Sequence, residues 1–489
     1  MYEYYKPLRN RLRKYALRPC LQQLWHIFEH VRNDRSSPYP DMSLRGMVHP
    51  WELSVLAREL VLNAGDFSVG KTFRHAPHFI EAITEVKKTA RAVQNEVVTA
   101  ANVVDEAPAM IYQQFPWHSR LTHRSMLRSW RLLSSPEMAK IVARVKRMDV
   151  KTIFRLGIHT AAQLRDHPTV TASTEFSKIG IPRETSERFF ASISTTVGAL
   201  RAQAQDQQRY DRNWFYTWNP LEVTPLLALD AAKPNLLTGP IPEYVLLVLA
   251  QGLYYDLVNE PDFNEYGYAF EDSVGGILRM LFPDPGYAIQ QETPYFVGKS
   301  RKDGVDWIVS DGTAHLFIEC KTKRLRLDAK MAGDANAIRA QLDALASMVV
   351  QHYKNIGDAK DGLTQWKPDG LPIYPIVLTL EDWHLFGPAV EHQLDALVRA
   401  KLNRANLPPS MMVDMPFTVV GIDDFVEGGA VASRLGLDAF FREKMSQTFR
   451  YWKFVDYAVH QWPELTASVE IPPVWGSLDE LLVSDEIRR

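Results

Sequence analysis

Asp306, Glu319 and Lys321 have types and a spacing that suit metal-assisted hydrolysis of a phosphodiester. Mg²⁺, or Mn²⁺ in its place, prefers hard oxygen ligands and keeps several waters, so two carboxylates and a backbone carbonyl such as that of Cys320 can hold it against a phosphate. The bound ion would lower the pKa of its water and neutralise charge on the phosphate. A lysine beside it can orient the attacking water or stabilise the negative transition state.

A predicted β-hairpin over residues 304–321 positions these side chains. Two runs rich in Val, Ile, Phe and Trp flank Asp311-Gly312, a dipeptide favoured in two-residue type I′ turns. The register of that turn pairs Ser310 with Thr313, Ile308 with His315, Asp306 with Phe317 and Gly304 with Glu319. Side chains alternate along each strand, so one face of the hairpin is wholly apolar and the other carries the two carboxylates as diagonal neighbours, with Lys321 two residues further along.

This pattern resembles the PD-(D/E)xK phosphodiesterase superfamily, which includes many restriction enzymes and repair nucleases. The resemblance rests on Asp306, a gap of twelve residues and then Glu319-Cys320-Lys321, with Val305 where the motif has proline. It covers residues 260–425 approximately. It implies an αβββαβ core with a restriction-endonuclease-like mixed sheet, in which the aspartate, the glutamate and the lysine are catalytic. The alternative is an exposed charged face on an ordinary sheet.

The resemblance also implies roles for residues outside the motif. Members of the family often carry an extra glutamate on the helix before the sheet, which favours Glu271 here, with Glu265 and Asp272 as alternatives. Gln341 is a secondary candidate, because some exonuclease-like members place a glutamine after the E-x-K strand. Lys323 and Arg324 (with Arg326) extend the active face toward substrate phosphates.

Periodicity predicts the elements around the hairpin. Apolar residues at helical spacing before the first strand predict a helix that packs on the sheet. Compact runs of β-branched residues are typical of buried strands. The expected strands are Tyr287–Val297, Ile373–Leu380 and Phe417–Ile422, and the expected covering helices are Ala335–Tyr353, 389–404 and 431–446.

The composition is that of an ordinary globular protein, and the length of 489 residues predicts two or more domains. The chain has 46% hydrophobic and 23% charged residues and only two cysteines, so neither a disulfide framework nor a zinc cluster is expected. The basic N-terminus lacks the apolar core of a signal peptide, and no run of eighteen apolar residues occurs. A cytoplasmic location without a membrane partner is the simplest expectation.

Charge and proline content suggest the domain organisation. Residues 1–250 contain 33 Lys and Arg against 23 Asp and Glu, whereas residues 251–489 contain 23 against 35. We therefore predict a helical, basic domain over 1–205 that binds nucleic acid or a partner, a proline-rich junction over 206–245, and a nuclease-like domain with C-terminal helices over 246–489. An offset of this size is also compatible with ordinary domains that simply differ in charge.

A row of arginines predicts where the first domain would contact nucleic acid. They recur at helical spacing on one predicted face, and contacts of this kind with phosphates give affinity without sequence choice. The row consists of Arg120, Arg124, Arg128 and Arg131. The row lies in the most basic region of the chain, residues 115–155, and the alternatives for this region are a solvated helix face or an interface with the acidic half of the chain.

Residues 65–72 match the P-loop pattern of nucleotide-binding proteins, but their context argues against that function. A P-loop follows a buried strand and opens a helix. Here the preceding residues 53–62 have helical periodicity, so we predict a loop after a helix.

Together these features predict a Mg²⁺-dependent endonuclease, directed at DNA in preference to RNA. A nuclease core joined to a large helical domain is similar to bacterial anti-phage defence or restriction systems, which is an analogy only. A toxic nuclease needs restraint, so a regulatory protein or self-association is a further hypothesis. The alternative function is a catalytically inactive nuclease-fold scaffold or nucleic-acid-binding subunit.

Overall fold

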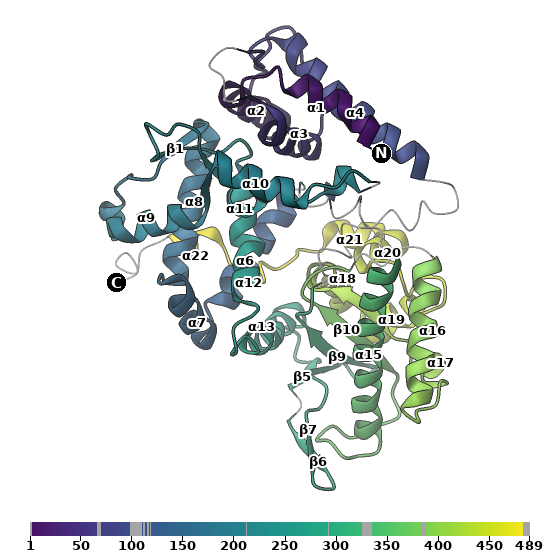
Figure 1. Ribbon diagram of the computed structural model, residues 1–489. Helices are drawn as coiled ribbons and strands as arrows, with labels where there is room; N and C mark the ends of the chain where they lie inside the picture. The colour runs from purple at the N-terminus through teal and green to yellow at the C-terminus, as the bar shows by residue number, and fades with distance from the viewer. Residues whose placement is uncertain are drawn as a thin grey trace. The chain divides into compact units, whose positions relative to one another are not determined.

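The computed structural model describes residues 2–65, 70–97, 110, 113–114, 117, 119–211, 213–291, 293–324, 335–383 and 388–482. The chain divides into two compact units (Figure 1). Unit 1 comprises Met1–Phe263 together with Trp475–Arg489, and unit 2 comprises Asn264–Val474. Among the described residues, no helix is long and apolar enough to cross a membrane.

Unit 1 is mainly helical and contains one small sheet. Its helices are α1 (Tyr2–Leu12), α2 (Leu17–Arg32), α3 (Pro50–Asn63), α4 (Ala76–Val97), α6 (Ser119–Leu133), α7 (Pro136–Lys146), α8 (Val150–Asp166), α9 (Arg183–Ser192), α10 (Val197–Gln207), α11 (Glu243–Leu247), α12 (Leu253–Leu257) and α22 (Leu478–Leu482). The π-helical segment η5 (Val248–Gly252) joins α11 to α12. Four three-residue strands pair in the order β1-β4-β3-β2, namely β1 (Thr169–Thr171), β4 (Leu236–Thr238), β3 (Leu226–Ala228) and β2 (Ser194–Thr196).

The domain boundary lies between Phe263 and Asn264 and not in the proline-rich stretch 206–245. That stretch contributes two strands and the 3-10 helix η3 (Trp214–Tyr216) to unit 1, and the three aromatic residues of η3 are buried. Proline ends short elements whether they lie in a linker or in a core. The proline content of residues 206–245 therefore could not distinguish a buried irregular segment from a junction between domains.

A buried ion pair ties this stretch to α3. Arg58 and Glu59 are fully buried, and Arg58 Nη2 lies 2.9 Å from Glu59 Oε1. The Glu59 carboxylate also accepts from Tyr5 Oη at 2.8 Å and from Trp214 Nε1 at 3.1 Å. Arg58 donates to the backbone carbonyls of Trp214 and Thr217. Both charges are thus paired and hydrogen-bonded, as burial of charge requires.

Unit 2 is built on a five-stranded mixed sheet with the order β11-β10-β9-β8-β5. The strands β5 (Ala288–Gln291), β8 (Trp307–Ser310) and β9 (His315–Lys321) are antiparallel neighbours, and β10 (Ile373–Thr379) and β11 (Thr418–Gly421) continue parallel to β9. The helices are α13 (Glu265–Leu281), α15 (Ala335–Lys360), α16 (Pro388–Arg404), α17 (Met411–Asp414), α18 (Ile422–Leu435), α19 (Leu437–Lys444), α20 (Phe454–Gln461) and α21 (Pro463–Ser468).

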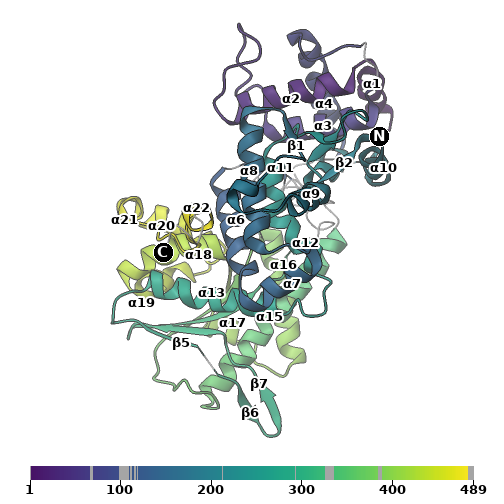
Figure 2. The same ribbon diagram turned by 90° about the vertical axis from the view of Figure 1, so that its left-hand side faces the viewer.

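Alternation along the hairpin strands decides which helix covers which face. Ile308 and Phe317 share one face and pack with the apolar side chains of α15, against which α16 packs in turn. Trp307 points to the opposite face and meets α13 at Gly275. The sheet of unit 2 is therefore covered on both sides, and Figure 2 shows α13 lying beside the strand β5.

Two details of the sheet differ from the sequence prediction. The predicted strand Tyr287–Val297 is divided into β5 in the main sheet and β6 (Tyr295–Val297), which pairs with β7 (Ser300–Lys302) in a separate hairpin. Pro294 lies between the two pieces, and proline has no N–H to donate to a sheet ladder. The strands expected near 373–380 and 417–422 are present as β10 and β11.

The turn between β8 and β9 is longer than predicted. The observed register pairs Ser310 with His315 and Ile308 with Phe317, two residues away from the predicted register. Asp311 accounts for the difference, because its Oδ1 accepts from the backbone N–H groups of Thr313 and Ala314 and closes a four-residue loop. A shift of two residues leaves every side chain on its predicted face, since the period of a strand is two.

We predict that Gly275→Ala destabilises unit 2 and that Gly276→Ala does not. A Cβ at Gly275 would overlap the Trp307 ring, whereas nothing lies within 4 Å of a Cβ at Gly276. Overpacking costs about 1–3 kcal/mol and alanine gains about 1 kcal/mol in helix propensity over glycine, so only the second variant keeps the gain. Urea denaturation of both variants measures the difference, and equal midpoints would contradict close packing of α13 on β8.

Candidate active site

Asp306, Glu319 and Lys321 lie together at one edge of the sheet. The register of β8 and β9, extended by one residue, places Asp306 directly opposite Glu319, instead of the predicted diagonal. Lys321 Nζ donates to Glu319 Oε1 at 2.6 Å, and the backbone N–H of Cys320 donates to Asp306 Oδ2 at 2.6 Å. The main chain of β9 thus fixes one carboxylate while a side chain of the same strand fixes the other.

Burial makes the charges at this edge interact strongly. Burial and the neighbouring Glu319 raise the pKa of Asp306 well above its ordinary value. Burial would also raise the pKa of Glu319, but the His352 ring and the Lys321 ammonium outweigh it and lower that pKa to about 2. The Lys321 pKa is raised because the two carboxylates outweigh the effect of its own burial. Two facing carboxylates, one of them destabilised as an anion, form an arrangement that a cation would relieve.

Glu271 is the third carboxylate at this edge. It lies on α13, its Oε1 accepts from Gln291 Nε2 at 3.3 Å, and its backbone carbonyl accepts from Trp307 Nε1 at 3.0 Å. Burial is the main cause of its raised pKa, and the charges of Glu319 and Lys321 also act on it. The structure therefore brings Glu271 into the electrostatic range of the motif residues.

The alternatives on α13 and the glutamine on α15 lie differently. Asp272 is exposed and Glu265 is half-buried. Gln341 is buried, and among the described residues its Oε1 has no hydrogen-bond partner. It precedes His352 by eleven residues on α15, which corresponds to about 16 Å along the helix. Its role stays a prediction.

Sequence reasoning missed His352 and Asn355, two buried polar residues of α15 that hold Glu319. Asn355 Nδ2 lies 3.5 Å from Glu319 Oε2 and donates to the carbonyl of Gly304 at 3.0 Å. His352 Nε2 lies 2.9 Å from the carbonyl of Phe317, and its Nδ1 lies 3.6 Å from Glu319 Oε2. The available signal was two polar residues within the apolar stripe of a helix, which does not by itself say what they contact.

The two basic residues after β9 have different surroundings. Lys323 is exposed. Arg324 is buried, and its guanidinium lies 3.0 Å from Glu381 Oε1 and 3.5 Å from Tyr266 Oη. A phosphate at Arg324 would have to compete with that carboxylate, whereas Lys323 can reach one from the surface.

The predicted arginine row on α6 is not uniformly exposed. Arg131 is exposed and Arg124 half-buried, whereas Arg128 is buried with its guanidinium 5.9 Å from the centre of the Trp475 ring. The side chain of Arg120 lies outside the described residues. A row with one buried member presents less positive charge to a ligand than the helical spacing alone predicted.

Acidic residues of unit 1 pair with the basic residues of α7. Arg144 lies 3.2 Å from Glu260 and 3.4 Å from Asp262, and Lys146 lies 2.5 Å from Asp256. All three acids come from the acidic half of the sequence, residues 251–489, so these ion pairs agree with the alternative that part of the basic region contacts that half.

The P-loop-like segment lacks the elements of a nucleotide site where the structure describes it. Residues 66–69 lie outside the described residues, and the element that precedes Gly65 is the helix α3 and not a strand. Lys71 Nζ lies 2.7 Å from Glu81 Oε2. The prediction of a loop after a helix agrees with this arrangement.

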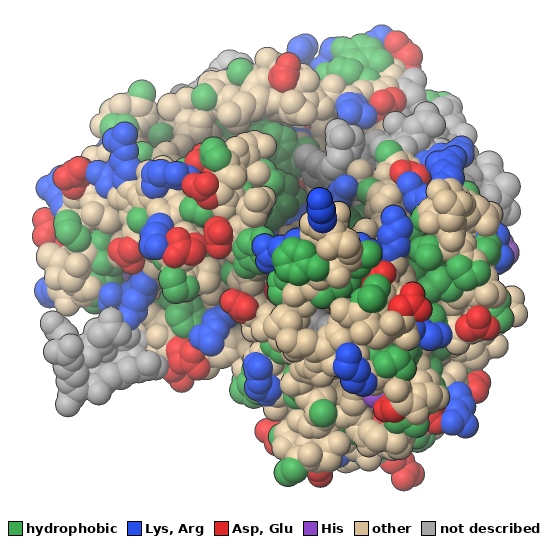
Figure 3. Space-filling view, turned by 90° about the horizontal axis from the view of Figure 1, so that it is seen from below, with side chains coloured by type: hydrophobic (Ala, Val, Ile, Leu, Met, Phe, Trp, Pro, Cys, Tyr) green, Lys and Arg blue, Asp and Glu red, His purple; other side chains and the backbone are tan. Residues whose placement is uncertain are grey.

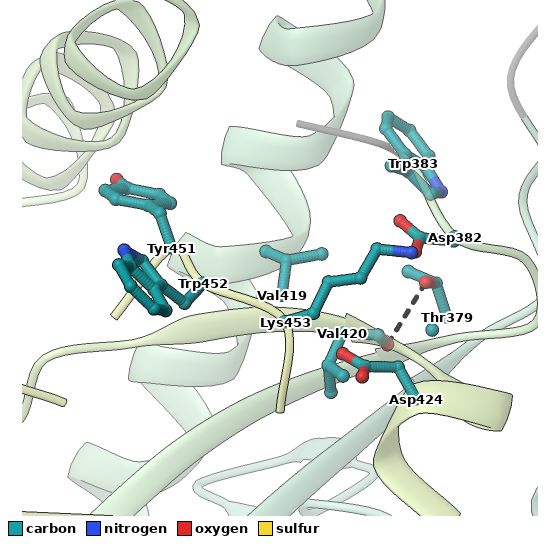
Figure 4. A pocket seen from close by; sticks show the side chains of 10 residues that line it. Thr379, Asp382, Trp383, Val419, Val420, Asp424, Tyr451, Trp452 and Lys453 are labelled. Carbon is teal, nitrogen blue, oxygen red and sulfur yellow. Dashed lines mark hydrogen bonds and ion pairs between the residues drawn. The ribbon is translucent and has the colours of Figure 1, made fainter. Parts of the chain in front are cut away.

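A small pocket lies at the carboxyl ends of β10 and β11, on the same sheet edge as Lys321 (Figure 4). Lys453 Nζ lies 2.7 Å from Asp382, and Asp424 accepts from the backbone N–H groups of Phe454 and Val455 at the start of α20. Burial raises the pKa of Asp424 to about 6. The cavity measures about 30 Å³, which is room for about one water, and Asp424 holds the start of α20 through its two backbone hydrogen bonds.

Asp306 and Glu319 offer carboxylate oxygens, the type of donor that a hard divalent cation prefers. Among the described residues, no group of three or more His, Cys, Asp or Glu is arranged to hold a metal ion. Mg²⁺ commonly takes only one or two carboxylates and completes its shell with waters and substrate oxygens. Asp306 and Glu319 supply the carboxylates, the Cys320 carbonyl can add a ligand, and Glu271 stands nearby. Comparison of the chain with known protein families, curated proteins and solved structures finds no match in any of the three.

Proposed function

We propose that unit 2 is a divalent-metal-dependent endonuclease that hydrolyses phosphodiester bonds, with DNA the favoured substrate. The observation that carries the proposal is the meeting of Asp306, Glu319 and Lys321 from two adjacent strands at one buried edge, with Asp306 held by the backbone N–H of Cys320. Two carboxylates and an amine on a rigid sheet meet the geometric demands of the chemistry.

The order of elements supports the same proposal. Along the chain, α13 is followed by β5, β8, β9, α15 and β10. This is the αβββαβ succession that the resemblance to PD-(D/E)xK enzymes implies, with the β6–β7 hairpin inserted between the first two strands. In this succession the aspartate directly precedes the second strand, and the glutamate and lysine lie among the last three residues of the third.

Each residue then has a defined task. Asp306 and Glu319 supply hard oxygen ligands, and His352 and Asn355 restrict the position of the Glu319 carboxylate. A bound Mg²⁺ or Mn²⁺ would activate a water and neutralise charge on the phosphate. The Lys321 amine is held against a carboxylate, and in that setting its charged form can stabilise the negative charge that develops on the phosphate.

Removal of the lysine tests the proposal. The purified chain, incubated with DNA and Mg²⁺ or Mn²⁺, should cleave it and should lose the activity in EDTA. Lys321→Ala should slow cleavage by at least about a hundredfold, because one preorganised group that stabilises developing charge is worth that much. Lys354→Ala removes an exposed lysine of α15 and should leave the rate unchanged. Undiminished cleavage by Lys321→Ala would overturn the assignment.

A second candidate function is a nuclease-fold subunit that binds nucleic acid without cutting it. It is favoured by the engagement of both Glu319 oxygens, one with Lys321 and the other with Asn355. Calorimetric titration with Mn²⁺ separates the two functions. If the chain binds Mn²⁺ and a variant without the Asp306 carboxylate does not, the nuclease function is supported. If the chain binds DNA but neither binds the metal nor cleaves, the subunit function is supported.

A further inference from the structure

The hairpin of β6 and β7 stands outside the five-stranded sheet. It connects β5 to β8, and both Figure 1 and Figure 2 show it projecting from the sheet of unit 2. Gly298 and Lys299 form its two-residue turn, in which Gly298 has a φ of +62°, a conformation that glycine adopts without strain. The register pairs Tyr295 with Lys302 and Phe296 with Arg301. Paired residues share a face, so the two pairs point in opposite directions.

One face of the hairpin is anchored. Tyr295 Oη and Lys302 Nζ each donate to Asp358 Oδ2 of α15 at 2.6 Å. The Tyr295 ring is buried in this contact. The hairpin is therefore fixed at its base and its orientation is set by α15.

The other face is open to solvent. Phe296 is 65% exposed and the Arg301 side chain is 65% exposed. No other phenylalanine that the structure describes is exposed. Asp303 lies 3.6 Å from the Arg301 guanidinium, which is too long for a hydrogen bond. A rigid strand thus presents an aromatic ring and a guanidinium as cross-strand neighbours, and this pair is called the outer face below.

The charge of the hairpin suits an anion. Residues 295–303 contain Lys299, Arg301 and Lys302 against one acid, Asp303, and Lys302 is paired with Asp358 of α15, so the charge offered to an anion is that of Lys299 and Arg301. Figure 3 looks at unit 2 from the side on which the hairpin projects, and it shows Lys and Arg side chains beside hydrophobic ones on the surface nearest the viewer. Hydrophobic and basic groups side by side match the two parts of a nucleotide, its base and its phosphate.

The hairpin is also close to the carboxylates along the chain. Arg301 precedes Asp306 by five residues. A chain advances at most about 3.6 Å per residue, so the Cα atoms of these two residues lie within about 18 Å of each other. That is within a few nucleotides of a phosphate held at Asp306.

We propose that the outer face binds an unpaired nucleotide of the substrate, with its base stacked on Phe296 and its phosphate at Arg301. The inference rests on the proposed nuclease function of unit 2. Base–aromatic stacking tolerates any sequence because every base has a π-face, and an arginine beside the ring adds attraction for the phosphate. Bases within an intact duplex are stacked on one another, so this site selects single-stranded stretches near the cleavage position.

Binding measured without metal tests the proposal. Fluorescence anisotropy in EDTA would follow a labelled single-stranded DNA of about 20 nucleotides and the blunt duplex of the same sequence. Phe296→Ala should raise the Kd for the single strand at least about fivefold and change the Kd for the duplex less than about twofold. Arg301→Ala should weaken single-strand binding and reduce its salt slope by about 0.7. Phe296→Trp should retain the affinity, because a larger ring still stacks.

Matched controls come from exposed residues elsewhere in unit 2. Val413→Ala and Arg442→Ala remove an exposed apolar and an exposed basic side chain and should leave both Kd values unchanged. Unchanged single-strand affinity in Phe296→Ala and Arg301→Ala, or equal losses on the duplex, would overturn the proposal. The binding measurement is made in EDTA and does not depend on cleavage. If the chain does not cut DNA in Mg²⁺ or Mn²⁺, the proposed nuclease function is wrong and the binding result still stands. If the chain cuts DNA but the variants bind with unchanged affinity, only the proposal for the outer face is wrong.

Discussion

Asp306→Asn should abolish cleavage while unit 2 keeps its fold. Asparagine preserves the shape of the side chain, and its amide oxygen can still accept from the Cys320 N–H that Asp306 now binds. It removes the negative charge that a divalent cation needs. We expect the cleavage rate at saturating Mg²⁺ to fall at least about a thousandfold, the upper end of what one preorganised electrostatic group contributes.

The same substitution should leave thermal stability unchanged or raised. Burial and the facing Glu319 both disfavour the Asp306 anion, so its removal relieves a repulsion in the folded protein. If Asp306→Asn loses activity and gains stability, the facing carboxylates of Asp306 and Glu319 serve function at the expense of stability. Asp361→Asn removes an exposed carboxylate of unit 2 and serves as the control. Cleavage by Asp306→Asn above a tenth of the normal rate would contradict the metal-ligand role.

Glu59→Gln should destabilise unit 1 by about 3–5 kcal/mol, because it leaves the fully buried Arg58 without its counter-charge. Glutamine keeps the shape and can accept only some of the bonds from Tyr5, Trp214 and Arg58. Urea unfolding followed by tryptophan fluorescence reports the change. The two units can unfold in separate steps, so the variant and the unsubstituted protein are compared at the transition that the substitution shifts.

The double variant Arg58→Met with Glu59→Met shows whether the loss comes from the unpaired charge. It removes both charges and should be less destabilised than Glu59→Gln alone. Glu3→Gln, at an exposed residue of α1, should change the free energy of unfolding by less than about 0.5 kcal/mol. A loss below about 1 kcal/mol in Glu59→Gln would mean that water reaches Arg58 in solution.

The faces of the β8–β9 hairpin could be predicted from the sequence, whereas its turn could not. The alternation of apolar and polar residues sorts side chains in any register that differs by an even number of residues. That is why Asp306, Glu319 and Lys321 were placed on one face despite a two-residue error. The turn type depended on whether Asp311 would bind its own backbone, and the dipeptide with Gly312 does not decide that.

Long-range contacts account for the rest of what the sequence did not reveal. His352 and Asn355 meet Glu319 only because α15 folds back over the sheet, more than thirty residues after the motif. The buried Arg128 lies against Trp475, from the far end of the chain. The residue pattern of a helix or strand predicts that element alone, so neither of these long-range contacts could be predicted from it.

Trp307 has a consequence for control of the site. Its indole joins the backbone carbonyl of Glu271 to the start of β8, one residue after Asp306, and its ring fills the place where Gly275 has no side chain. The helix α13 begins one residue after Asn264, where unit 2 begins. Because this hydrogen bond and this contact join α13 to β8, a displacement of the helix would also displace the strand that follows Asp306.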